Sequence, residues 1–425
     1  MTTTVAGSTL TRHIHRMGMA LWLAATSLSA SADEPALRLD THPTFADALR
    51  NGRFEAQVRP RLNRIHEARK PERADAVTAR VIAGWKSAPF HGLRLAAELI
   101  HSDRIGPRRF NDNPREVSPY PLLPDPRFSG INQAWVDWSG EFANIRIGRQ
   151  RLRLDNERFV SDNDFRQVPQ MFTGAALRGR LGAEAEWRAG RFTRLRGTRG
   201  VESDIKLSFA QAAWNPAPGQ ALLGYLMWYE PPPGGGQTGA TNNAHRVAGA
   251  RWQGQVKTSG GGSWLYHLEA ARQSAHAGGD SVISADYLRV GGGWAAGAAR
   301  GEWVVRLDHE VKGSNTGRYG LQTPLTDLYA YNGWALQFVT TPREGLRDTW
   351  ITVKKPLGPV DVFGEVHRFR ADAGGANLGR ELDLGLIWRV PAWLGDDARL
   401  IAQTARYRQP GNDVTKLWVA LDWRY

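Results

Sequence analysis

Charged residues capable of chemistry crowd into one tract, residues 148–167 (GRQRLRLDNERFVSDNDFRQ), of a 425-residue chain. Its carboxylates could serve as general acid and base, but arginines lie within a few residues of each carboxylate and more often simply neutralise it. The tract holds Arg149, Arg151, Arg153, Arg158 and Arg166 with Asp155, Glu157, Asp162 and Asp164, and Arg146 lies just upstream. An apolar core does not accommodate such charges, so we expect a solvated loop or the wall of a water-filled passage.

No other feature of the sequence indicates an enzyme or a cofactor. Nucleophile-elbow, zinc-protease and phosphate-loop motifs are missing, and the 11 histidines are scattered without metal-ligand spacing. The chain has no cysteine, which excludes disulfides and thiolate ligands. We therefore expect no cofactor and no metal site, and catalysis by Asp155, Asp162 and Asp164 stays a minor alternative.

Apolar residues at every second position predict β-strands from residue 53 onward. In residues 53–63 (RFEAQVRPRLN), Phe54, Val58 and Leu62 alternate with polar residues that include Arg59, and the next segment carries Arg80 on its polar face. Such segments number roughly 16 to 18, as in bacterial outer-membrane barrels. The expected fold is all-β, a single transmembrane antiparallel β-barrel. A soluble β-sandwich is the alternative, but its packed core would reject the charged faces.

Aromatic residues at the ends of apolar faces also favour the barrel. Girdles of tryptophan and tyrosine lie at both bilayer interfaces of such proteins. Candidates for these girdles are Trp85, Trp138, Trp187, Trp388 and Trp423. Residues 103–130, 230–243 and 311–331 are long polar connections, which we expect to be extracellular, whereas short turns face the periplasm.

The N-terminus has the pattern of a secretory signal. Arg12 and Arg16 precede a short apolar stretch that ends in Ala30-Ser31-Ala32. We expect a signal peptide at 1–32 with cleavage near Ala32, a short periplasmic segment at 33–52 and the barrel at 53–425. No apolar stretch is long enough for a transmembrane helix.

The alternation changes phase inside the charged tract. Ile145 and Ile147 are apolar at odd positions, but Leu152 and Leu154 are apolar at even positions. A bulge or bend starting at Gly148 would produce this change. The charged residues that follow would then fold into the lumen or against the rim of the barrel.

Five collinear elements resemble the alginate export family of outer-membrane porins. They are the tract at 148–167, YPLLPDPRFSGINQAWVDW, PLTDLYAYNGWALQFVTTPREGLRDTW, LGRELDLGLIW and the terminal KLWVALDWRY. The resemblance implies a monomeric barrel of about 18 strands in which an arginine-lined pore passes anionic polysaccharide. It places the family's inward-facing charges at Arg149, Arg151, Asp155 and Asn156. The second half of the tract, RFVSDNDFRQ, is closer to broader porin relatives, which leaves smaller acidic solutes as an alternative permeant.

We therefore expect a bacterial outer-membrane channel for passive passage of anions, with a net charge of +13 that reflects arginine on lumenal strand faces and not a nucleic-acid-binding patch. Expected partners are an acidic polysaccharide or small anionic solute, outer-membrane lipid, lipopolysaccharide and the barrel assembly machinery. The predicted pore-lining residues are Arg59, Arg80, Arg146, Arg149, Arg151, Asp155, Asn156, Arg158 and Arg166. A structural or adhesive barrel with a loop-plugged lumen is the main alternative, and a barrel enzyme is the lesser one.

Overall fold

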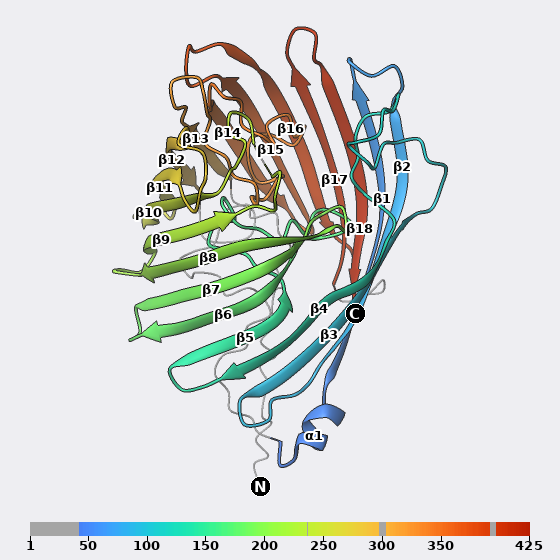
Figure 1. The fold of residues 1–425 in the computed structure, drawn as a ribbon, viewed down its shortest axis with the longest axis vertical. Helices are drawn as coiled ribbons and strands as arrows, with labels where there is room; N and C mark the ends of the chain where they lie inside the picture. The colour runs from blue at the N-terminus through green and yellow to red at the C-terminus, as the bar shows by residue number, and fades with distance from the viewer. Residues whose placement is uncertain (1–41, 236, 297–302, 392–396) are drawn as a thin grey trace.

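The computed structural model describes residues 42–235, 237–296, 303–391 and 397–425, and these ranges contain eighteen strands and one short helix. Each strand pairs antiparallel with the next, and β18 pairs with β1, so the sheet closes into a barrel (Figure 1). The elements are α1 (Phe45–Arg50), β1 (Arg53–Glu67), β2 (Ala74–Lys86), β3 (Leu93–Arg104), β4 (Phe128–Ser139), β5 (Ala143–Gln150), β6 (Met171–Leu181), β7 (Ala185–Arg196), β8 (Glu202–Trp214), β9 (Gln220–Glu230), β10 (His245–Lys257), β11 (Ser263–Ala275), β12 (Ser284–Ala295), β13 (Val304–Lys312), β14 (Leu346–Leu357), β15 (Val360–Arg370), β16 (Asn377–Arg389), β17 (Asp397–Arg408) and β18 (Val414–Arg424).

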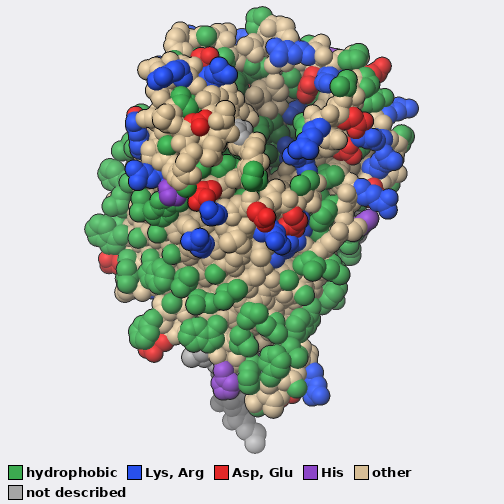
Figure 2. Space-filling view, in the orientation of Figure 1, with side chains coloured by type: hydrophobic (Ala, Val, Ile, Leu, Met, Phe, Trp, Pro, Cys, Tyr) green, Lys and Arg blue, Asp and Glu red, His purple; other side chains and the backbone are tan. Residues whose placement is uncertain are grey.

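Alternation along the strands separates an outer apolar surface from an inner polar one. On β1, Phe54 and Leu62 are exposed on the outside, whereas Arg59 and Arg61 point inward and are buried. Figure 2 shows hydrophobic side chains over the body of the barrel, with most of the visible lysine and arginine side chains in the upper half of the view. The predicted all-β barrel is confirmed, at the upper end of the expected strand number.

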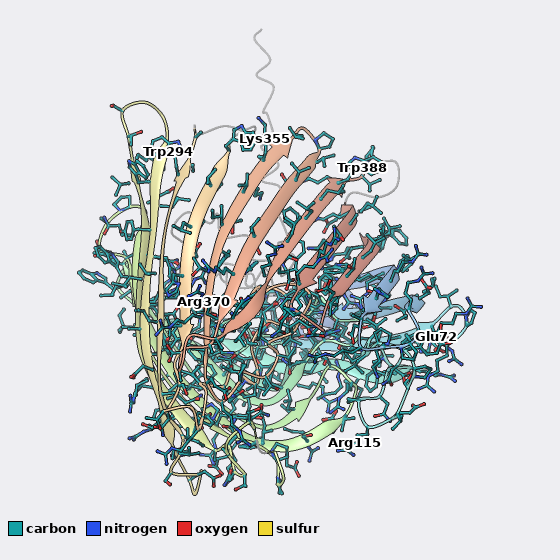
Figure 3. All side chains as sticks on the ribbon, turned by 90° about the horizontal axis from the view of Figure 1, so that it is seen from above. Glu72, Arg115, Trp294, Lys355, Arg370 and Trp388 are labelled. Carbon is teal, nitrogen blue, oxygen red and sulfur yellow. The ribbon has the colours of Figure 1, made fainter. Side chains whose placement is uncertain are left out.

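The two ends of the barrel differ in their connections. Short turns such as 182–184 and α1 lie at one end, where Tyr425 also hydrogen-bonds with Ala56 of β1. We call this the turn end and the opposite one the loop end. In Figure 3, Trp294, Lys355 and Trp388 lie toward one end, and Glu72 and Arg115 toward the other. The five tryptophans predicted for two girdles all lie near strand ends at the turn end, so they form a single girdle.

The connection between β5 and β6 folds into the barrel, and we call residues 151–170 the first lumenal loop. Pairing of β5 with both neighbours stays in register through Gly148, whose φ is 127°. The bulge predicted at Gly148 is therefore not a register shift. The strand β5 ends at Gln150. Beyond it, Leu152 and Leu154 are buried inside the barrel and do not face lipid.

The connection between β13 and β14, residues 313–345, is the second lumenal loop. Its residues Tyr319, Leu321 and Ala335 are fully buried, so the expectation that 311–331 lies outside the barrel is wrong. The two loops pair where Val160 forms a parallel bridge with Leu325. A plug of apolar and polar side chains thus fills the lumen near the loop end, because two long connections turn inward together.

The helix α1 precedes the first strand and is capped by Thr44, whose hydroxyl accepts from the Asp47 amide at 3.1 Å. No helix in the described ranges is long or apolar enough to cross a membrane. The predicted signal peptide, 1–32, and residues 33–41 of the predicted periplasmic segment lie outside the described residues.

Candidate functional site

Ion pairs around Asp164 hold the first lumenal loop against β1, β2 and β18. Arg59 donates to the Asp164 main-chain oxygen at 2.6 Å and to the Asp422 carboxylate at 2.5 Å. Arg80 donates to Asp164 Oδ1 at 3.0 Å, and Arg151 lies 3.1 Å from the same oxygen. Burial alone would raise the pKa of Asp164, but Arg80, Arg151 and Arg59 outweigh it and hold that pKa well below its usual value. We call these five residues the Asp164 cluster.

The tip of the loop reaches the opposite wall of the barrel. Asp155 is paired with Arg251 of β10, and the Asn156 amide donates to Glu269 of β11 at 2.9 Å. Burial raises the pKa of Asp155 to about 6, and the nearby Arg251 opposes this rise. The loop therefore spans the lumen from β1 to β10 and β11.

Arg158 and Arg166 bind the loop to other buried groups. The Arg158 guanidinium donates to Glu310 of β13 at 2.8 Å and to Asn332 of the second lumenal loop at 3.0 Å. Arg166 lies over the Tyr329 ring, with 5.2 Å between the guanidinium carbon and the ring centroid. Both arginines are buried, so they join the two loops and the wall and leave little surface for a solute.

Backbone strain accompanies this docking. Asp155, Glu157 and Asn163 have φ values of 50°, 62° and 50°, in the left-handed region that side chains other than glycine disfavour. Each such residue costs about 1 to 3 kcal/mol, and surrounding contacts must offset that cost. Here those contacts are the ion pairs and hydrogen bonds to the wall.

Paired charges differ in how far each partner reaches the lumen. The cations are partly exposed, whereas their carboxylate partners lie beneath them. The side chains of Arg151 and Arg424 are 23% and 27% exposed, while Asp164, which both contact, is 2% exposed. The same relation holds for Arg146 over Asp137 and Arg153 over Asp162. Guanidinium groups therefore dominate the polar surface offered to lumenal water in this region.

The structure brings all but one of the predicted pore residues into the lumen. Arg149 is the exception, because it shares the outward side of β5 with Ile147 and pairs with Glu202 of β8 at 2.7 Å near the loop end. Its prediction as a pore residue is wrong. Arg59, Arg80, Arg158 and Arg166 are lumenal but buried, so the wet, exposed ion pairs assumed from the sequence are replaced by packed ones.

Several functional neighbours escape sequence reasoning. Asp422, Glu310, Glu269 and Arg251 supply the wall side of the contacts described above. Their inward parity can be read from the alternation of their strands. Which loop residue each one meets depends on the path of the loop, and no local signal reports that path.

Family comparison identifies the type of barrel. The profile of the alginate export family matches residues 94–312, which is more than half of the chain. The chain belongs to the alginate export family. This is a family of outer-membrane channels and not of enzymes, so a bacterial outer-membrane location follows. Comparison with curated protein sequences finds no match.

Solved structures of other proteins have the same barrel fold as this alginate export family member. OpdL of Pseudomonas aeruginosa is 14% identical, with a TM-score of 0.66 over 89% of this chain and 99% of its own. OccAB2 of Acinetobacter baumannii is 14% identical, with a TM-score of 0.67 over 89% and 99%. OpdK of Pseudomonas aeruginosa, solved with vanillate, is 14% identical, with a TM-score of 0.67 over 89% of this chain and 99% of its own. At these identities the likeness establishes the barrel fold alone.

Proposed function

We propose that this alginate export family member is an anion-preferring channel for passive passage of acidic solutes. The carrying observation is the partial exposure of Arg146, Arg151, Arg153 and Arg424 above buried carboxylates. A narrow lumen with exposed positive charge concentrates anions and excludes cations. Candidate permeants are acidic polysaccharide such as alginate and smaller uronates or organic acids.

Size divides these permeants into two groups. With both lumenal loops docked, the plug favours single acidic sugars and small carboxylates, whereas a polymer would require the loops to move aside. OpdK, a barrel of similar fold, was solved with vanillate, an aromatic carboxylate. The small acids are therefore the first permeants to test, and the family description favours including alginate oligomers.

The outer surface suggests the remaining partners. The apolar band would contact outer-membrane lipid, and lipopolysaccharide would surround the loop end. The terminal strand β18 ends close to Trp423 and Tyr425, both exposed, which fits the aromatic signal that barrel assembly machinery recognises. We expect a monomer, since the closed barrel leaves no strand edge to pair with a second copy.

Reversal potentials in planar bilayers with a salt gradient test the proposal. The wild-type channel should prefer anions. The double variant Arg151→Gln, Arg424→Gln should lower the anion-to-cation permeability ratio about two- to fivefold, because each lost charge changes an ion's energy by roughly 0.5 kcal/mol at several ångströms in water. Arg149→Gln is the control, since it removes one positive charge from the outer side and should leave the ratio unchanged, whereas either single lumenal variant should lower it.

A second candidate, a structural barrel with a closed lumen, is favoured by the burial of both lumenal loops. A folded, heat-modifiable protein that never conducts would support it and contradict the channel. Conductance with equal ratios in wild type and double variant would refute the anion preference alone. Liposome swelling then ranks the permeants by comparing the swelling rates in glucuronate and in glucose. Adding alginate oligomers tests whether they block the entry of these solutes.

A further inference from the structure

A histidine and two carboxylates meet on the lumenal face of β15 and β16, away from the arginine clusters. Glu365 lies directly opposite Asp383 across the two strands, and His367 is two residues further along β15. His367 Nε2 is 3.4 Å from Glu365 Oε2 and 3.8 Å from Asp383 Oδ2. One potential ligand atom from each residue lies within 4.8 Å of the other two.

Neighbouring groups fix the orientation of the His367 imidazole ring. Nδ1 of His367 is 2.9 Å from Asp348 Oδ1, so this nitrogen donates to a carboxylate and Nε2 is directed at the other two residues. Trp350 and Phe369 stack on the ring with interplanar angles of 13° and 14°. Histidines that bind metals commonly have this arrangement, in which the second ring nitrogen donates to a carboxylate.

The two carboxylates are also oriented and short of positive partners. Thr352 donates to Glu365 Oε1 at 2.9 Å, which leaves Oε2 toward the histidine. Asp383 and the adjacent Glu381 are almost completely buried, and Asp383 Oδ1 and Glu381 Oε2 accept no hydrogen bond within the described part of the chain. In that part, His367 is the one basic side chain within ion-pair distance of Glu365 and Asp383.

Like charges directly opposite each other destabilise a sheet, and a buried carboxylate oxygen that accepts no hydrogen bond adds a desolvation cost. A cation would remove both penalties. We propose that Glu365, His367 and Asp383 bind a divalent first-row transition-metal ion, with Asp348 as the positioning residue of the histidine.

Chemistry and geometry fit such an ion. One imidazole with two carboxylates suits zinc, manganese and iron better than calcium, which prefers oxygen donors alone. Donors at zinc distances of about 2.0 to 2.2 Å lie about 3.3 Å apart in a tetrahedron, close to the separations from Nε2. The Glu365 side chain is 18% exposed, which gives the ion a route from the lumen. This site is independent of the proposed anion preference.

Zinc binding to the tag-free, chelator-stripped barrel tests the proposal by equilibrium dialysis and metal analysis. The wild type should bind about one equivalent. Asp383→Asn and Glu365→Gln should each weaken binding by at least tenfold, and Asp348→Asn by about 10- to 100-fold. X-ray absorption should show one imidazole nitrogen with oxygen donors.

The control is His276→Gln, because His276 and Glu230 form another histidine–carboxylate pair, 4.0 Å apart at the loop end. This variant should bind zinc as the wild type does. Heat-modifiable migration checks that each variant is folded, and the partly exposed Glu365 supplies a second variant if Asp383→Asn does not fold. Absence of stoichiometric zinc in the wild type, or equal binding by all variants, overturns the proposal and leaves a shared proton between the carboxylates.

Discussion

At the residue scale, the single carboxylate of Asp164 determines where the first lumenal loop contacts the barrel wall. Asp164 is shared by Arg59, Arg80 and Arg151, which come from two strands and the loop itself. Buried pairs of this kind add little net stability because desolvation consumes most of the attraction, but removal of one partner leaves a costly unpaired charge. Asp164 therefore specifies where the loop docks more than it stabilises the barrel.

The free-energy cost of a charged side chain on a strand depends on whether that side chain faces lipid or the lumen. Leu384 is 49% exposed in the middle of β16, on the lipid side. Leu384→Arg should lower the free energy of unfolding by about 2 to 4 kcal/mol near the bilayer midplane. Urea unfolding in lipid vesicles measures this loss, with Leu384→Met as the near-neutral control. Equal stability of the Arg and Met variants would show that Leu384 does not face lipid.

The neighbouring position on β16 shows that an inward-facing residue need not reach water. Asp383, on the lumenal side, would have been a cheap site for arginine if the lumen were wet there. Instead, Asp383 is fully buried beside Glu381 and the Trp334 amide, which donates to it at 3.3 Å. An inward position thus carries no guarantee of solvent, because the second lumenal loop covers this part of the wall.

At the element scale, we expect the docking of the two lumenal loops on each other to depend on pH. Burial raises the pKa of Asp327 to about 6, and burial likewise raises that of Glu157 to about 7 although Arg153 opposes it. Both groups bind protons more readily in the docked loops than in loops released into water. Docking is therefore favoured below the ordinary carboxyl pKa of about 4 and loses this contribution as pH rises through about 6 to 7.

Single-channel recordings at pH 5 and pH 8 check this sign. Loop-opening events should be more frequent at pH 8. Asp327→Asn should reduce the dependence, since its amide oxygen can still accept from the Tyr329 and Ala330 amides that Asp327 binds at 2.8 and 3.0 Å. Glu202→Gln, outside the lumen, should behave as the wild type. Unchanged pH dependence in Asp327→Asn would exclude this junction as the sensor.

At the scale of the whole molecule, the outer-membrane location predicts that a signal peptide is cleaved from the N-terminus. We predict from the Ala30-Ser31-Ala32 site and the outer-membrane barrel that the mature chain begins near Asp33. Intact-mass measurement of protein from outer-membrane fractions should give the chain without residues 1–32, and Ala32→Leu should slow cleavage. An uncleaved chain in the normal outer-membrane fraction would contradict the assignment.

The sequence by itself determined the barrel and the two faces of its strands. Period-two alternation is local, so it is visible without any knowledge of strand neighbours. It placed Arg59 and Arg80 inside and Leu62 outside, and the resemblance carried by five collinear elements indicated the family. The phase change after Gly148 predicted a bulge there, whereas β5 keeps its register to Gln150 and the chain turns inward only after that residue.

Only the tertiary structure decided the rest, because those features depend on contacts between distant segments. Arg149 belongs to the outer side since β5 keeps its register to Gln150, one residue before the chain turns inward. The docking of the tract on Asp422, Glu269 and Glu310 depends on loop paths that no local pattern encodes. The histidine cluster joins β14, β15 and β16 through their register, so spacing along the chain could not reveal it.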